Sequence, residues 1–385
     1  MIFIPMSKIT RGMKLPENVL VFNSSNVLLL NKNTVVTDQL LERLYNFQVP
    51  GVYIQDELSG DLVPSKPILT TKVKAQTLNN IEWLFNDSVE DKVSSKQKQR
   101  RIRQIDKTVS NLVDLIKKND TILVNISDLK SYDDYTYHHS LSVAIIALAI
   151  GVQLKLTETE LKRLGFCAVM HDIGKMKVPI ELINKPGRLT GMEFGVVKKH
   201  AEYSGEYLIE NEIKDPEIYN AVICHHEHFD GSGYPYGLFE KEIPIYSKII
   251  SVSDVYDAIT SNRSYRDPAL PSEAAEYLMA NCGNVFDIDI VRAFMEKIEF
   301  FPLGSFVELS NGSKAIVIEN SAPLRPTVRL LERPNTVIDL FSDRRYLNVT
   351  ITQLFNDIPM ADINALSKKN SGLGKPILTS PSSTA

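Results

Sequence analysis

The histidines of this chain are confined to one part of the sequence. All seven lie between positions 138 and 228, and six of them stand beside another histidine, an aspartate or a glutamate. Imidazole nitrogens and carboxylate oxygens bind first-row metals such as iron, manganese, nickel and zinc, and one carboxylate can bridge two ions. The clustering therefore predicts a metal centre. The residues concerned are His138-His139, His171-Asp172, His200 and His225-His226-Glu227-His228, followed by Asp254 and Asp257.

Length and composition narrow the class of protein. The 385 residues, 43% apolar and 23% charged, suffice for a substantial core and for roughly two or three domains. The net charge of −4 argues against a nucleic-acid polymer as partner. The opening residues do not resemble a secretory signal, and the longest apolar stretch, 143–154, is shorter than the ~20 residues of a membrane helix. We therefore expect a protein without a membrane anchor.

The three cysteines, Cys167, Cys224 and Cys282, are far apart in the sequence. Their number and spacing fit neither a disulfide framework nor a zinc site built from paired cysteines. A reducing, cytoplasmic location is the expectation that follows.

The hydrophobic patterns predict a multidomain α+β protein with a central all-helical bundle. Near the N-terminus, short apolar runs surround a helical pattern for which Asp38 is a plausible N-cap. Near the C-terminus, two strand patterns flank Asn311-Gly312, which is typical of a two-residue hairpin turn. The expected parts are an α+β module of unknown ligand (1–57), a linker (58–69), a charged helical segment (70–132), the histidine-bearing bundle (133–300), a small β-rich module (301–355) and a disordered tail (356–385).

The charged segment contains a notable run of basic residues. Five of the eight residues from Lys96 to Arg103 are lysine or arginine. A solvated helix face is the simplest interpretation, and a docking or dimerisation surface is the alternative.

The candidate ligands are associated with apolar runs that predict buried helices. His139 opens one such run, whereas His171, His225 and Asp254 each follow one. Burying an aspartate such as Asp172 beside a histidine is costly unless something pairs with it, and a metal ion is one such partner. Any one of these residues alone would favour an ordinary core position. Four helices carrying imidazole or carboxylate out of apolar runs favour a shared metal site.

Three sequence motifs resemble the HD-GYP family, a branch of the HD metal-dependent phosphohydrolases. They are His171-Asp-Ile-Gly-Lys175, Asn184-Lys-Pro-Gly187 with Leu189-Thr190, and the string from His225-His-Glu to Gly233-Tyr-Pro235. The resemblance covers 133–266, about a third of the chain. It implies an HD-type helical bundle that acts as a metal-dependent phosphodiesterase on the second messenger cyclic di-GMP.

The resemblance also implies a set of metal ligands and a reaction. Two divalent ions, iron or manganese, would activate a water that attacks phosphorus, giving the linear dinucleotide pGpG and, after a second cleavage, GMP. Asp172 would bridge the ions. Family members with a third metal carry a glutamate where this chain has Tyr135, so the two-metal version is expected here. The implied ligands are His139, His171, Asp172, His200, His225, His226 and Asp254, whereas His138 and His228 are not motif ligands.

The same resemblance implies which residues contact substrate. Lys175 would lie on the same helix face as His171 and place its ammonium near the phosphate or the leaving oxygen. Glycines in the loop at 230–235 would allow turns with positive φ, and Tyr234 would offer a ring and a hydroxyl. The implied substrate contacts are Lys175, Gly233, Tyr234, Pro235, Arg263 and Arg266. Ser264 stands between the arginines where the family commonly has proline; Glu240 and Ser253 also depart from the pattern.

Two other functions remain open. The fold could act as a receptor or scaffold that binds cyclic di-GMP and signals through a homodimer or a protein partner, although the retained ligands argue against this. It could also hydrolyse another nucleotide, as other HD phosphohydrolases do, although the Gly-Tyr-Pro loop argues against that reading.

Overall fold

The computed structural model describes most of the chain in two compact units. One unit is helical and lies within residues 65–300; the other contains the described residues before 65 and after 300. The described residues are 2–5, 9, 11–12, 19–20, 28–30, 34–46, 51–54, 68–69, 71–89, 94–118, 135–261, 269–333 and 335–355. The predicted linker falls almost wholly outside these ranges, and the predicted disordered tail does so entirely.

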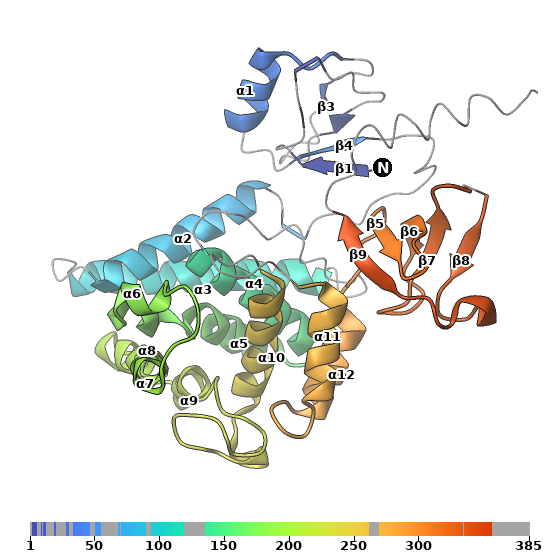
Figure 1. Ribbon diagram of the computed structural model, residues 1–385. Coiled ribbons are helices and arrows are strands. Elements are labelled where there is room, and N and C mark those ends of the chain that lie inside the picture. The colour runs from blue at the N-terminus through green and yellow to red at the C-terminus, as the bar shows by residue number, and fades with distance from the viewer. Residues whose placement is uncertain are drawn as a thin grey trace, which may run out of the picture. The chain divides into compact units, whose positions relative to one another are not determined.

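The helical unit confirms the expected helical bundle (Figure 1). Its helices, together with the short 3-10 helices η3 and η4, are α2 (Thr71–Val89), α3 (Ser95–Lys118), α4 (Tyr135–Gln153), α5 (Glu158–Met170), η3 (Ile173–Lys177), α6 (Ile180–Ile183), α7 (Gly191–Lys198), α8 (His200–Glu210), α9 (Pro216–Ile223), η4 (Glu240–Glu242), α10 (Ile245–Thr260), α11 (Pro271–Ala280) and α12 (Ile288–Lys297).

Helix α4 forms the centre of this unit. Every side chain from 141 to 150 is buried, and the helix packs against α2, α3, α5, α10 and α12. A helix that is apolar on all sides is stable in water only when neighbours surround it, and each large apolar side chain buried there contributes about 1.5–3 kcal/mol. His139, the candidate ligand on α4, is therefore held by a rigid, enclosed helix.

The charged segment belongs to the same packed unit. The buried side chains of α3, among them Ile105, Val109, Leu112 and Ile116, recur every three or four residues and face α4 and α5. Three of the five basic residues of the run are exposed and two are half-buried. One of the latter, Arg101, has its guanidinium 4.6 Å from the ring centroid of Trp83 on α2. The exposed residues agree with a solvated helix face.

The N-terminal described residues form a short antiparallel sheet and one helix. The strands are β1 (Ile2–Pro5), β2 (Val19–Leu20), β3 (Leu28–Leu30) and β4 (Gly51–Ile54), in the order β1-β4-β2-β3, and α1 spans Asp38–Asn46. The prediction that Asp38 caps this helix is wrong. Thr37 takes that position, because its hydroxyl accepts a hydrogen bond from Leu40 N at 3.3 Å, and Asp38 is the first helical residue.

The C-terminal module confirms the expected β structure. Five antiparallel strands follow the order β8-β7-β6-β5-β9. Their bounds are β5 (Phe306–Leu309), β6 (Lys314–Glu319), β7 (Thr327–Leu330), β8 (Val337–Asp339) and β9 (Ile351–Phe355). The β5–β6 turn is longer than predicted, since four residues separate the strands. Asn311 Oδ1 accepts a hydrogen bond from Ser313 N at 3.0 Å, and Gly312 adopts a φ of +80°.

None of the helices in the described part of the chain combines the length and apolar character needed to span a membrane.

One close approach of two backbones positions the metal centre. A Cβ atom at Gly174 would lie 2.1 Å from the His200 carbonyl oxygen and 2.4 Å from Ser204 N, so η3 can pack on α8 only with glycine there. The Ser204 hydroxyl completes the joint, because it accepts a hydrogen bond from Gly174 N (2.9 Å) and donates one to the His171 carbonyl (2.8 Å).

Replacing glycine at two helical positions should have opposite effects. Gly174→Ala should lower the free energy of unfolding by about 2 kcal/mol or more, because backbone atoms must separate to admit the methyl group. Gly195→Ala, in α7 with open space around the new Cβ, should raise it by about 0.5–1 kcal/mol. Urea denaturation of both variants measures this. Equal stabilities of the two variants would contradict the packing described.

Candidate metal centre

The bundle brings all seven sequence-predicted ligand positions to one place. His139 comes from α4, His171 and Asp172 from the end of α5, His200 from the start of α8, His225 and His226 from the segment after α9, and Asp254 from α10. Their ligand atoms form three overlapping groups in which all atoms lie within 4.8 Å of one another, namely His139-His171-Asp254, His171-Asp172-His225 and His200-His225-His226.

Asp172 lies between two sets of histidines. Its Oδ2 is 3.5 Å from His139 Nε2 and 3.2 Å from His171 Nε2. Its Oδ1 faces the other way, 3.4 Å from His200 Nε2 and 4.0 Å from His225 Nε2. The carboxylate is almost completely buried. Each oxygen therefore faces a different pair of histidines, and a carboxylate placed in this way would be able to bridge two ions.

The C-terminal ends of three helices orient three of the imidazoles. The last carbonyls of an α-helix have no partner within the helix, and a side chain just beyond the end can donate to them. His171 Nδ1 donates to the Ala168 carbonyl of α5 at 2.8 Å. The corresponding bonds run from His200 to the Val197 carbonyl of α7 (2.7 Å) and from His225 to the Val222 carbonyl of α9 (2.6 Å). Each of these rings therefore carries a proton on Nδ1, which leaves Nε2 as the nitrogen that can bind a metal ion.

His139 is oriented by a carboxylate instead. Its Nδ1 is 2.8 Å from Asp257 Oδ2, while its Nε2 is 3.2 Å from Asp254 Oδ1. Asp257 is buried one turn beyond Asp254 on α10. A carboxylate behind a ligating histidine fixes the ring orientation and increases the basicity of the ligand nitrogen.

This donor set fits divalent metal ions. Nε2 of His200 and Nε2 of His225 are 3.4 Å apart. Since both rings carry their proton on Nδ1, neither Nε2 can donate to the other, and two lone pairs face each other. In addition, His171 Nε2 and Asp172 Oδ1 are buried without a hydrogen bond in the described part of the chain. Converging lone pairs beside a buried carboxylate are costly unless a cation lies among them.

The pKa shifts keep the ligands in the forms that bind metal. Burial lowers the pKa of His200 to about 4 and that of His226 to about 3, and it also lowers the pKa of His225. Burial alone would raise the pKa of Asp172 and of Asp254, but His171 and Lys175 beside Asp172 and His139 beside Asp254 outweigh it, and both pKa values lie well below the ordinary range. At neutral pH the three imidazoles are neutral and the two carboxylates are charged.

Lys175 reaches the centre by a different route from the one predicted. The α-helix does not continue past Met170, and Lys175 lies in the 3-10 helix η3. A 3-10 helix has three residues per turn, so Lys175 shares a side with Asp172 rather than with His171. Its ammonium pairs with Asp172 Oδ2. The predicted proximity to the centre holds, although the helical register was wrong.

The Gly-Tyr-Pro loop packs directly on the histidines. The Tyr234 ring stacks on the His226 ring, with centroids 4.8 Å apart and planes 26° apart, and Tyr234-Pro235 is a cis peptide. Gly231 has the expected positive φ, +76°. Gly233 does not, and glycine is required there for another reason. A Cβ would lie 2.3 Å from His228 N and 2.5 Å from Glu227 Cα.

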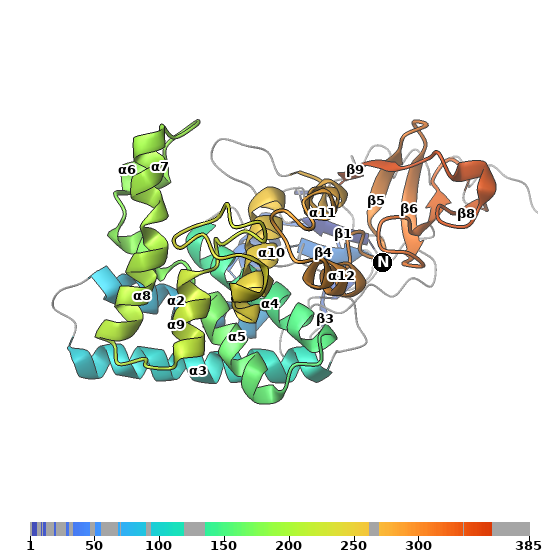
Figure 2. The ribbon, with the colours of Figure 1, turned by 90° about the horizontal axis from the view of Figure 1, so that it is seen from below.

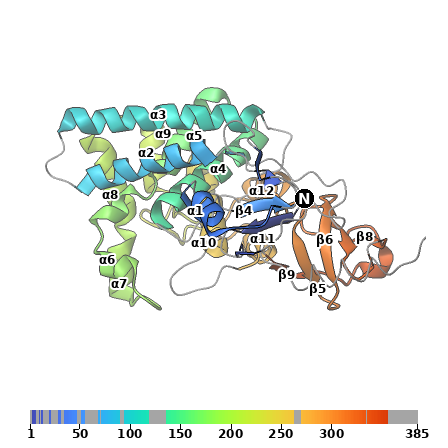
Figure 3. The same ribbon diagram turned by 90° about the horizontal axis from the view of Figure 1, so that it is seen from above.

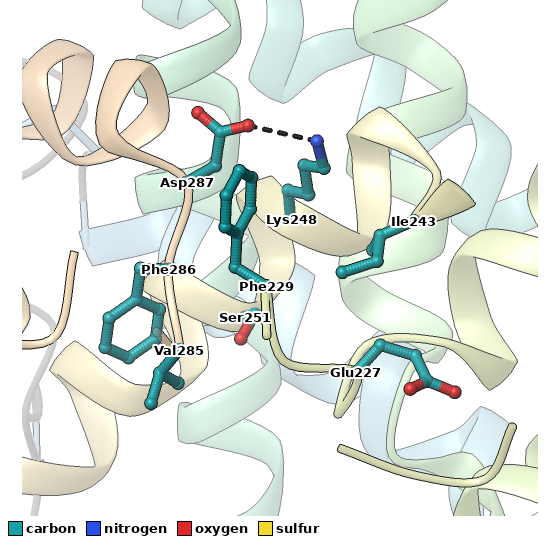
Figure 4. A pocket seen from close by; sticks show the side chains of 8 residues that line it. All are labelled: Glu227, Phe229, Ile243, Lys248, Ser251, Val285, Phe286 and Asp287. Atoms are coloured by element: carbon teal, nitrogen blue, oxygen red, sulfur yellow. Dashed lines mark hydrogen bonds and ion pairs between the residues drawn. The ribbon is translucent and has the colours of Figure 1, made fainter. Parts of the chain in front are cut away.

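Glu227 holds this loop in place. Its buried carboxylate accepts hydrogen bonds from Tyr236 N (2.7 Å) and Leu238 N (3.0 Å). The base of the loop is fixed beside it, where the Lys248 ammonium of α10 pairs with Asp287 at 3.0 Å and lies 5.3 Å from the Phe229 ring centroid (Figure 4). The helix that carries Asp254 therefore also anchors the loop.

The other positions singled out in the sequence lie outside the described residues or outside the three ligand groups. Arg263 and Arg266 lie outside the described residues, as does the side chain of Tyr135. His228 is on the outer side of the loop, where its Nδ1 is 2.9 Å from the Ser232 hydroxyl. His138 precedes His139 on α4 and belongs to none of the three ligand groups.

The sequence did not predict the supporting roles of Asp257 and Glu227, although both lie in the predicted cluster, and it did not identify Ser204 at all. Asp257 carried a usable signal, because it lies one helical turn from Asp254. Glu227 lay within the recognised motif, but its targets are backbone amides nine and eleven residues further along. Ser204 had no signal, since its partners are distant in sequence.

Part of the chain is similar to known proteins. Residues 103–290 match the family model described as HD domain. A solved structure from Bdellovibrio bacteriovorus, described as an HDG"Y"P protein, superposes with a TM-score of 0.50 at 20% identity, covering 76% of this chain and 97% of that one, which shows a shared fold. The chain therefore contains a region similar to the HD-domain family, as its sequence motifs predicted.

Several relatives of this chain have curated activities. A cyclic di-GMP phosphodiesterase of Pseudomonas aeruginosa is 35% identical over 244 residues, 60% of this chain and 59% of that protein. One from Thermotoga maritima is 33% identical over 177 residues, 46% of this chain and 48% of that protein. The 3'3'-cGAMP-specific phosphodiesterase 2 of Vibrio cholerae is 30% identical over 195 residues, 50% of this chain and 37% of that protein. The chain thus spans 59% or less of the length of these relatives.

The lowered histidine pKa values predict an acid-sensitive HD domain. The unfolded chain takes up a proton on His200 near pH 6.5, whereas the folded, metal-free protein does so only near pH 4. The free energy of unfolding should therefore fall as the pH drops through this window, by on the order of 3 kcal/mol from His200 alone. Chelator-treated protein unfolded in urea between pH 7 and pH 4 measures it. A flat profile across this range would disprove the buried neutral state.

Asp257→Asn should weaken metal binding without unfolding the domain. The neutral amide no longer stabilises the His139 orientation electrostatically, and loss of such a supporting carboxylate typically costs 10–100-fold in metal affinity. Manganese titration of the metal-free protein gives the affinity. Ser261→Ala is the matched control, because Ser261 bonds the other oxygen of Asp257 at 3.1 Å and does not touch His139. Unchanged affinity in Asp257→Asn would contradict the role.

Proposed function

We propose that this chain hydrolyses cyclic di-GMP to pGpG, to GMP or to both. The observation that carries the proposal is the position of Asp172, whose two oxygens face separate sets of histidine Nε2 atoms. Such a site suits the paired-ion chemistry by which phosphodiesters are cleaved. The cyclic di-GMP phosphodiesterases among the relatives support the choice of substrate.

We further propose that the centre holds two divalent ions, iron or manganese. His139, His171 and Asp254 would hold one ion, His200, His225 and His226 the other, and Asp172 would bridge them. When bound, the ions would polarise the phosphodiester and lower the pKa of a water molecule. Imidazole and carboxylate donors suit both metals.

The residues around the centre would bind and orient the substrate. Lys175 pairs with a ligand carboxylate and is 28% exposed, so its ammonium can also reach a phosphate or the leaving oxygen. The wall formed by Gly233, Tyr234 and Pro235 would limit water access, and burial raises the pKa of Tyr234, which keeps its hydroxyl protonated as a hydrogen-bond donor. We assign phosphate or guanine contacts to Arg263 and Arg266 on the family resemblance.

A second candidate substrate is 3'3'-cGAMP. The observation that favours it is the similarity to a Vibrio cholerae phosphodiesterase specific for that nucleotide. A receptor role through a homodimer or another protein partner is less favoured, because the complete donor set is retained. We propose the cytoplasm as the compartment, consistent with three free cysteines. We also propose the division into domains predicted from the sequence, including an N-terminal α+β module of unknown ligand.

Asp172→Asn should abolish hydrolysis while the fold persists. The amide has nearly the same shape but cannot serve both histidine sets as an anion, and we expect kcat to fall about a thousandfold or more. The assay follows cyclic di-GMP, 3'3'-cGAMP and their linear products by chromatography, with anaerobic protein supplied with iron or manganese. Asp289→Asn, an exposed aspartate of α12, is the matched control.

Three outcomes separate the candidates. Preferential turnover of cyclic di-GMP by the wild type, lost in Asp172→Asn, supports the proposal. Preferential turnover of 3'3'-cGAMP would replace the substrate. Tight binding of cyclic di-GMP without turnover in either metal would replace the enzyme by a receptor.

A further inference from the structure

One lysine beside the metal centre has an unusual environment. Lys198 is the last residue of α7, two positions before the candidate ligand His200. Its ammonium lies 4.8 Å from the Phe194 ring centroid and 4.8 Å from the Tyr234 ring centroid. The two rings are nearly perpendicular, with centroids 6.3 Å apart. The ammonium is thus held in an aromatic notch between α7 and the Gly-Tyr-Pro loop. Figure 2 shows α7 extending from the bundle next to α8.

Unlike three other lysines in this part of the bundle, Lys198 has no acidic partner among the described residues. Lys175 pairs with Asp172, Lys177 with Glu206 at 3.1 Å, and Lys185 with Glu193 at 2.7 Å. Within the described ranges, no carboxylate lies at ion-pair distance from Lys198. An aromatic face attracts a cation but does not neutralise it, so the positive charge stays available for an anion.

The notch is directly coupled to the centre. The Tyr234 ring that contacts the Lys198 ammonium also stacks on His226, one of the candidate ligands. Phe194 on the other side is 45% exposed, so the notch opens to solvent. Half-buried and held against two rings, Lys198 loses less side-chain freedom on binding a ligand than a fully solvated lysine does.

We propose that Lys198 holds the second, unreacted phosphate of a cyclic dinucleotide while the metal centre acts on the first. The inference rests on the proposed function and deepens it. A cyclic dinucleotide carries two phosphodiesters in one small ring, so one remains charged near the reacting group. A cation without an acidic partner at the edge of the centre matches that charge. Lys198 is therefore a positioning residue that contributes to substrate binding and leaves the chemical step unchanged.

The test compares a substrate that has the second phosphate with one that lacks it. Lys198→Met removes the charge and keeps most of the apolar stem, and Lys198→Arg keeps the charge. Lys199→Met is the matched control, an adjacent exposed lysine with the same change in charge. Each protein is assayed in its metal-loaded form with cyclic di-GMP and with bis(p-nitrophenyl) phosphate, which has a single phosphodiester. Metal content and melting temperature are measured alongside.

The proposal predicts a split between the kinetic constants. Lys198→Met should raise KM for cyclic di-GMP about tenfold with kcat nearly unchanged, the signature of lost binding shared by ground and transition states. Hydrolysis of bis(p-nitrophenyl) phosphate and metal content should not change. Lys198→Arg should restore most of the affinity, and Lys199→Met should behave as the wild type.

Other results would overturn it. If Lys198→Met left KM for cyclic di-GMP unchanged, or impaired both substrates equally, Lys198 would only join α7 to the loop. An equal effect of Lys199→Met would show that only the overall positive charge of this region matters. Failure of the proposed function is recognised separately, because the wild type itself would then fail to cleave any cyclic dinucleotide, and the inference would fall with it.

Discussion

The buried carboxylate of Asp172 is the constraint on which the rest of this structure depends. A charged group enclosed by protein is stable only when opposite charge or strong donors surround it. Here the Lys175 ammonium pairs with one oxygen, and the other neighbours are histidines whose Nδ1 protons are committed elsewhere. A bound cation would meet the remaining need, so occupancy of the centre would add to the stability of the domain.

The orientation of the ligands depends on where the helices around α4 end. Helix α4 is buried along its length and fixes His139, whereas α5, α7 and α9 end at the centre. Each of these ends supplies an unpaired carbonyl that fixes an imidazole. The joint between η3 and α8, which requires Gly174, keeps two of these ends in register.

The sequence predicted the residue types of the site better than it predicted the geometry. The metal centre was predicted from the residue types, from their clustering and from the apolar runs beside them, because a buried imidazole or carboxylate needs a partner. The 3-10 register of Lys175 and the close packing at Gly233 could not be read this way. Both depend on backbone contacts between segments that no periodicity describes. The capping of α1 by Thr37 rather than Asp38 was a choice between two good N-cap residues in adjacent positions, which local sequence leaves undecided.

The account is tested most directly by titrating metal-free protein with manganese and recording electron paramagnetic resonance spectra at low temperature. A centre bridged by Asp172 predicts two ions bound per chain and an exchange-coupled signal from the pair. A single bound ion with the spectrum of isolated manganese, persisting at saturation, would contradict it.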